Sequence, residues 1–106
     1  MKTTINENAE NILVKLSGDL DTAAAQETEK EFKPLMDAKG KTITIDCSEL
    51  NYVSSSGLRL FLSLLKSCKP NGNTLTLESL NDNIKKVFAM TGFASLFNIK
   101  LFILKN

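Results

Sequence analysis

The sequence contains no histidine, and this absence excludes several kinds of chemistry. Without an imidazole the chain cannot build a Ser-His-Asp or Cys-His catalytic arrangement, one of the usual zinc sites, or imidazole acid/base catalysis. Its two cysteines, Cys47 and Cys68, are too few for a disulfide scaffold or a metal cluster. We therefore expect a protein that is not an enzyme, with no catalytic residue, no metal site and no bound cofactor.

An excess of charge is also missing, because 13 Lys and Arg residues are balanced by 12 Asp and Glu residues. A nucleic-acid-binding protein usually carries a clear basic excess that neutralises phosphates. No apolar run reaches the roughly 18 residues that a membrane helix needs, and the polar residues 1–11 lack the apolar core of a secretory signal. These absences predict a cytoplasmic protein that neither binds nucleic acid nor inserts into a membrane.

What the chain does contain is an alternation of strand and helix patterns along its 106 residues. Apolar and polar residues alternate at 12–17, 42–47, 74–77 and 99–103, and a weaker strand at 3–7 precedes a hairpin turn at 8–11. Helices are expected at 22–38 and 56–69, with a third between the caps at 81–83 and Gly92, and a loop is expected at 48–54.

This order predicts an α/β fold with a mainly parallel sheet of four to five strands, because parallel strands need crossover helices. The strands alternate instead of being continuously apolar, so we expect the helices to lie mostly on one face of the sheet. A length of 106 residues fits one domain covering 1–106.

Some local features are expected at the ends of these elements. Asp21 or Thr22 is a suitable N-cap for the first helix, and Gly40 suits its C-terminal cap. Pro34 predicts a kink or a break near Lys33, because proline removes a backbone donor.

The two cysteines fall at opposite ends of this arrangement. Cys47 closes a strand, and Cys68 closes a helix of about 12 residues that runs back beside it, which separates the thiols by about 18 Å. A disulfide needs Cα atoms within about 7 Å. We therefore expect them to be unbonded and to act as small buried hydrophobic residues.

Three serines and a glycine, Ser54-Ser55-Ser56-Gly57, lie where the third strand and its loop lead into the second helix. Helix capping needs only one of them. The others place spare hydroxyl groups at the carboxyl end of a strand, where α/β sheets usually build their sites. Capping alone and a functional site both remain open at this point.

The second helix carries an unusually broad apolar face, about 200° wide, whereas an ordinary surface helix needs only slightly more than about 100°. One explanation is a helix wedged between the sheet and a neighbouring helix. The other is that Leu60 and Leu64 are surplus to the core and form an apolar patch for a partner.

Residues 46–61 resemble the central motif of STAS domains, the family of the anti-sigma factor antagonists. The core of this motif is YVSSSGL at residues 52–58. Residues 18–23 are similar to the family's Gly-Glu-Leu-Asp segment before the first helix. Residues 87–93, followed by Phe97 and Ile99, are similar to its closing helix and last strand. The resemblance extends over nearly the whole chain and implies a single STAS domain.

The resemblance also implies a switch. In bacterial partner switching, the unphosphorylated antagonist binds an anti-sigma factor that is also a serine kinase, and a sigma factor is released. The kinase then phosphorylates the antagonist and ends the complex, and a metal-dependent serine phosphatase restores it. The resemblance assigns the phosphorylated serine to Ser55, with Ser56 and Ser54 less favoured. Together with the apolar face of the second helix, it gives the expected partner-binding residues: Asp21, Thr22, Ser54, Ser56, Gly57, Leu58, Arg59, Leu60 and Leu64.

One position departs from the family pattern. Phosphorylated antagonists carry Asp immediately before the target serine, where this chain has Ser54. An alternative therefore stays open, in which a non-phosphorylated STAS module serves as a structural or regulatory subunit of a transporter or sensory complex. An enzyme that uses Asp19, Asp21 and Asp46 is a weaker competitor, because no base is evident that could activate a serine.

Overall fold

The computed structural model describes residues 1–100 as strands and helices in the expected alternating order. The strands are β1 (Lys2–Glu7), β2 (Asn11–Leu20), β3 (Thr42–Val53), β4 (Thr74–Glu78) and β5 (Asn98–Lys100). The helices are α1 (Thr22–Asp37), α2 (Ser55–Asn71) and α3 (Asp82–Met90), and a short 3-10 helix, η1 (Phe93–Ser95), precedes β5. The strand expected at 99–103 overlaps β5, and its residues 101–103 lie outside the described residues.

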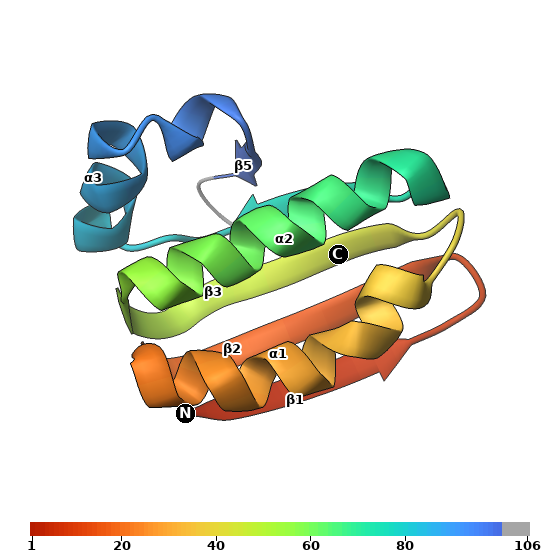
Figure 1. Cartoon of the computed structure of the whole chain (residues 1–106), viewed down its shortest axis with the longest axis horizontal. Coiled ribbons are helices and arrows are strands. Elements are labelled where there is room, and N and C mark those ends of the chain that lie inside the picture. Colours follow the sequence, from red (N-terminus) through yellow and green to blue (C-terminus); the bar gives the residue numbers. More distant parts are fainter. Residues whose placement is uncertain (101–106) are drawn as a thin grey trace.

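The strands form one mixed sheet of five strands in the order β1-β2-β3-β4-β5. β1 and β2 pair antiparallel as a hairpin, and β2, β3, β4 and β5 run parallel to one another. A helix joins the two strands of each parallel pair, because the chain must return to the edge of the sheet where the first strand began before it can form a parallel one. Figure 1 shows α1 and α2 side by side on one face of the sheet. The predicted α/β class, the mainly parallel sheet and the one-sided cover of helices are confirmed.

Alternation along β2 and the first half of β3 gives the sheet a buried face and a more exposed face. In β2, Val14 and Leu16 are fully buried, whereas Leu13 beside them is 42% exposed. The helices complete the core from the other side, and each contributes a phenylalanine that is 0% exposed: Phe32 from α1, Phe61 from α2 and Phe88 from α3. The apolar positions of strands and helices therefore meet in one layer between the sheet and α1 and α2.

The predicted loop at 48–54 is wrong, because β3 continues as a strand to Val53. The strand contains one more residue than β2 between the pairs Lys15–Asp46 and Ser17–Glu49, and again one more between the pairs Gly18–Leu50 and Asp19–Tyr52. Such bulges interrupt the two-residue alternation that identifies a strand in a sequence. They occur where β3 approaches its carboxyl end, next to the candidate site.

The ends of α1 differ in part from the prediction. The expected break near Lys33 is absent, because the helix runs through Pro34 to Asp37. Pro34 lies in the last turn, so the hydrogen bond that it cannot donate to the carbonyl four residues earlier is lost only three residues before the helix ends. Ala38, in an extended conformation, is the C-cap, and Gly40 instead adopts a positive φ of 68° in the turn into β3. None of the helices described within residues 1–100 has the length and apolar character needed to cross a membrane.

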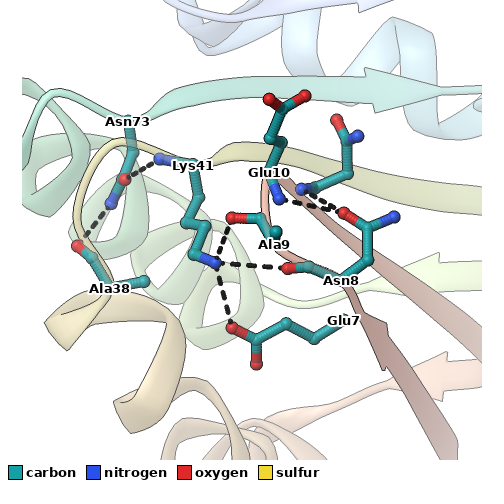
Figure 2. Close-up of polar contacts among 8 residues, drawn as sticks. Glu7, Asn8, Ala9, Glu10, Ala38, Lys41 and Asn73 are labelled. Carbon is teal, nitrogen blue, oxygen red and sulfur yellow. Dashed lines mark hydrogen bonds and ion pairs between the residues drawn. The ribbon is translucent and has the colours of Figure 1, made fainter.

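Lys41, just before β3, joins several connections at the amino edge of the sheet (Figure 2). Its ammonium group donates to the backbone carbonyls of Asn8, at 3.2 Å, and Ala9, at 2.6 Å. Its backbone N–H donates to the side-chain oxygen of Asn73 at 2.7 Å, and the amide nitrogen of Asn73 donates to the carbonyl of Ala38 at 2.8 Å. The hairpin turn, the α1–β3 connection and the α2–β4 connection are thereby held together, at the edge opposite the candidate site.

Both cysteines are buried and unbonded, as predicted. Burial, and to a smaller degree the carboxylates of Asp46 and Glu78, raise the pKa of the Cys47 thiol to about 12. The thiol therefore stays protonated near neutral pH, and Cys47 acts as a small core residue.

Candidate phosphorylation and partner-binding site

Two helices begin side by side at the carboxyl edge of the sheet. Leu20 at the end of β2 pairs with Val53 at the end of β3, and the backbone N–H of Ser54 donates to the carbonyl of Leu20 at 2.9 Å. The next residue after each strand caps a helix, because Asp21 is the N-cap of α1 and Ser54 is the N-cap of α2. The two helix N-termini are therefore neighbours at the edge where parallel α/β sheets usually carry their sites.

The three serines have three different surroundings. Ser54 is only 8% exposed, and its hydroxyl oxygen accepts a hydrogen bond from the backbone N–H of Gly57 at 3.1 Å. Ser55 is the first residue of α2 and is exposed. Ser56 is half-buried, and its hydroxyl lies 3.4 Å from Nη2 of Arg59. Capping therefore accounts for Ser54 alone and leaves the Ser55 hydroxyl at the surface.

Gly57 allows α2 to pack closely against the ends of the two strands. A Cβ atom at this position would lie 2.9 Å from Cγ and Cδ2 of Leu20 and 3.0 Å from Cγ1 of Val53. Both neighbours are buried, so they have little freedom to move aside. The glycine of the motif is thus required by packing beneath the serines, and it is buried instead of lying on the binding surface.

Asp21 and Thr22 lie at the surface next to the serines. Oδ1 of Asp21 accepts a hydrogen bond from the backbone N–H of Ala24 at 2.8 Å, which confirms Asp21 as the N-cap. Both side chains are exposed. Because Asp21 directly follows Leu20 and Ser54 is bonded to Leu20, its carboxylate adds a negative charge close to the start of α2.

Of the two explanations for the broad apolar face of α2, the one in which Leu60 and Leu64 form a patch for a partner is wrong. Leu60 is 5% exposed and Leu64 is 0% exposed, and both belong to the core. Leu58 is 6% exposed and is likewise part of it. The broad apolar face exists because α2 packs against both the sheet and α1, which was the alternative explanation of the same pattern. These leucines support the site from beneath and offer no surface to a partner.

A shallow groove of about 300 Å³ runs between α1 and α2 beside the serines. It is lined mainly by polar side chains: Gln26 and Glu29 of α1, and Ser56, Arg59 and Ser63 of α2. Of these, only Ser56 and Arg59 were predicted from the sequence. The missed residues follow the helix repeat, because Gln26 and Glu29 are one and two turns beyond Thr22, and Ser63 is one turn beyond Arg59.

Two further features lie at the same edge of the sheet, an exposed tyrosine near the end of β3 and the N-terminus of α3. Tyr52 is 52% exposed and lies three residues before Ser55. The side-chain nitrogen of Asn81, the N-cap of α3, donates to the backbone carbonyl of Leu50 at 3.1 Å. The bulged end of β3 is therefore joined to α3 by this hydrogen bond as well as to β2 by strand pairing.

This arrangement suits a negatively charged group at residue 55. The first turn of a helix has backbone N–H groups without helical partners, and the helix dipole is positive at that end.

Within residues 1–100, no group of three His, Cys, Asp or Glu side chains is arranged to hold a metal ion.

The comparison with known families decides where the chain belongs. The model of the STAS domain matches residues 2–103. The chain belongs to the STAS domain family. The match covers all the elements described above, including the Ser55 motif and the α1 segment beside it.

Two proteins named as antagonists resemble this one over most of their length. BtrV of Bordetella bronchiseptica, provisionally named an anti-sigma factor antagonist, is 29% identical over 93% of this chain and 85% of its own. The anti-sigma-B factor antagonist of Bacillus subtilis is 27% identical over 90% of this chain and 86% of its own.

Solved structures of the anti-sigma factor antagonist SpoIIAA have the same fold. Its unphosphorylated form has a TM-score of 0.76 at 17% identity, with 97% of this chain and 90% of that chain covered. Its phosphorylated form, from Bacillus, has a TM-score of 0.72 at 19% identity, with 92% of this chain and 90% of that chain covered.

Proposed function

We propose that this protein is an anti-sigma factor antagonist whose binding is controlled by phosphorylation of Ser55. In its unmodified form it binds an anti-sigma factor that is also a serine-protein kinase, and a sigma factor is released. Phosphorylation of Ser55 ends this complex, and a metal-dependent serine phosphatase restores the binding form. The protein acts in the cytoplasm, by binding and not by catalysis. The observation that carries the proposal is the exposed Ser55 hydroxyl at the first residue of α2.

The chemical step belongs to the kinase. The γ-phosphoryl group of ATP is transferred to the Ser55 oxygen, which loses its proton, and ADP leaves. The product carries about −1.5 to −2 additional charges. At the start of α2 this charge meets free N–H groups and the positive end of the helix dipole, so the domain itself tolerates it.

The same charge inside a protein interface has a different outcome. A buried phosphate loses its hydration and gains repulsion from any partner carboxylate nearby, and these costs are not recovered unless the partner supplies a matching cation. Phosphorylation would therefore weaken the complex without unfolding the domain. The relatives named as anti-sigma factor antagonists support the choice of partner class.

The surface that we assign to the partner surrounds Ser55 on both helices. Asp21 and Thr22 are exposed on α1, and Arg59 is exposed on α2. Ser56 lies at the groove between them. Ser54, Gly57, Leu58, Leu60 and Leu64 are buried, so their contribution is to hold the exposed residues in place.

A second function rests on Ser54, which stands where phosphorylated antagonists carry Asp. The protein would then be a non-phosphorylated STAS module in a transporter or sensory complex. In that case its association with a partner would not depend on charge at residue 55. Ser54 fits the switch as well, because its hydroxyl already caps α2 as an aspartate would.

Partner capture distinguishes these functions. The wild type, Ser55→Asp and Thr42→Asp are each used to capture proteins from the native cytosol, and bound proteins and phosphopeptides are identified by mass spectrometry. Thr42 is the matched control, because it is exposed at the amino edge of the sheet, where β3 begins.

The switch predicts a kinase-like ATPase that is captured by the wild type and Thr42→Asp and lost with Ser55→Asp. It also predicts a phosphopeptide modified at Ser55. Capture of the same partner by all three proteins, with no phosphopeptide, would reject the switch. A transporter ATPase among those shared partners would favour the second function.

A further inference from the structure

Arg59 is the only arginine in the chain and lies four residues after Ser55 on the same helix. Its Nη2 atom is 3.4 Å from the Ser56 hydroxyl, so the guanidinium group is turned back toward the N-terminus of α2. Helical side chains lean in this direction, because each Cα–Cβ bond tilts toward the start of the helix. Arg59 is exposed, and none of the ion pairs found among residues 1–100 includes it.

Residues four apart on a helix are neighbours, with about 5–6 Å between their Cβ atoms. The guanidinium group is a planar fork of donors that matches phosphate oxygens and stays charged at every relevant pH. We propose that Arg59 binds the phosphate when Ser55 is phosphorylated, as an ion pair within α2 that keeps the phosphate in its dianionic form. This inference rests on the proposed function, because it concerns the modified state of the same serine.

Several charges near residue 55 would act on a phosphate there, and Arg59 is the cation among them. Glu29 of α1 lines the same groove as Arg59, and Asp21 at the start of α1 disfavours a second negative charge nearby. The N-terminus of α2 acts in the opposite direction and favours an anion. Because the second pKa of phosphoserine is about 6, a nearby cation that lowers this pKa brings the added charge close to −2 near neutral pH.

The ion pair would also increase the free-energy cost for a partner to bind the phosphorylated form. A partner would have to bury the phosphate together with Arg59 or separate the two charges. Either event adds a desolvation cost to the one that the phosphate already carries. Arg59 belongs to the surface assigned to the partner, so pairing with the phosphate would also withdraw it from that contact in the phosphorylated form.

The test uses protein in which phosphoserine is introduced at position 55 during translation, so no kinase is needed. The phosphate is titrated by ³¹P NMR in the parent and in the Arg59→Gln and Arg59→Lys variants. Lys66→Gln is the matched control, because Lys66 is an exposed cation on α2 that lies 11 residues after Ser55. Removing it changes the net charge by the same amount at a distance from the phosphate.

We expect Arg59→Gln to raise the phosphate pKa by about half a unit, the scale of an exposed ion pair. Arg59→Lys should keep most of the effect, and Lys66→Gln should leave the pKa unchanged. The difference between parent and Arg59→Gln should shrink in 1 M salt, because salt screens exposed charges.

Equal phosphate pKa values in the parent and Arg59→Gln would overturn the inference. A larger effect of Arg59→Gln when phosphoserine is placed at position 56 would overturn it too, because the pair would then belong to Ser56. The titration contains no anti-sigma factor, whereas partner capture with Ser55→Asp uses no variant of Arg59. The failure of one proposal is therefore distinguishable from the failure of the other.

Discussion

Replacing Gly57 with alanine is the most direct test of the packing that supports the serines. The new Cβ would lie 2.9 Å from Cγ and Cδ2 of Leu20 and 3.0 Å from Cγ1 of Val53, distances that real Cβ atoms rarely show. Leu20 is 0% exposed and Val53 is 6% exposed, so neither has free space to enter. The helix or the strand ends must therefore shift.

Two opposing effects determine the free energy of unfolding of Gly57→Ala. Alanine favours the helix over glycine by at most about 1 kcal/mol. Overpacking in a well-packed core costs about 1–3 kcal/mol. The cost is larger here because two buried side chains are contacted at once, and we expect a net loss of about 1 kcal/mol. For a domain of this size, that corresponds to a melting temperature lower by about 4–8 °C.

Thermal and urea unfolding, followed by circular dichroism, would measure this change. Ser56→Ala is the matched control, because it places a helix-favouring alanine at the adjacent residue without a new buried atom, and its stability should stay within about 0.5 kcal/mol of the parent. If Gly57→Ala were as stable as the parent or more stable, α2 would not be packed as tightly on Leu20 and Val53 as described.

Further predictions concern the capping serine, the Lys41 contacts and one exposed ion pair. Ser54→Ala should lower the free energy of unfolding by about 1 kcal/mol through loss of the N-cap, whereas Ser55→Ala should change it by less than about 0.5 kcal/mol, both by urea denaturation. Lys41→Met should cost about 1 kcal/mol in the same assay, because two backbone carbonyls lose a charged donor. A hydrogen bond from Lys15, and then its charge, hold the pKa of Glu49 below its usual value of 4.5. At a pH above 4.5 the ion pair makes its full contribution to the free energy of unfolding, and this contribution is lost as the pH falls through the lowered pKa of Glu49. Glu49→Gln lacks the carboxylate, so its free energy of unfolding should fall less on acidification than that of the parent. An identical acid-unfolding curve for the two would contradict this interpretation.

Much of the fold could be predicted from the sequence because its signals are local. The alternation at residues 12–17 and 42–47 places apolar side chains on one face, and those side chains are buried in the structure. Asp21, Asn81 and the serine run are strong N-cap signals, and Asp21, Ser54 and Asn81 are the N-caps of the three α-helices described within residues 1–100. The position of the candidate site at the carboxyl edge followed from the order of strands and helices.

The parts that could not be predicted depend on contacts between elements. The bulges of β3 disrupt the alternation, so the strand end at 48–53 resembled a loop. A helical wheel shows that Leu60 and Leu64 are on an apolar face, but not that α1 and the sheet together cover this face. The groove that Glu29 shares with Arg59 is likewise a product of the packing of α1 on α2.

The switch at Ser55 is tested most directly by measuring stability and affinity on the same variant. For Ser55→Asp we expect a free energy of unfolding equal to or slightly above that of the parent, because an acidic residue in the first turn of a helix is favourable. The affinity for the anti-sigma factor kinase, measured by calorimetry, should fall by at least about 30-fold, which corresponds to the roughly 2 kcal/mol cost of an unmatched charge in an interface. A folded Ser55→Asp variant that binds as tightly as the parent, or one that no longer folds, would contradict the switch.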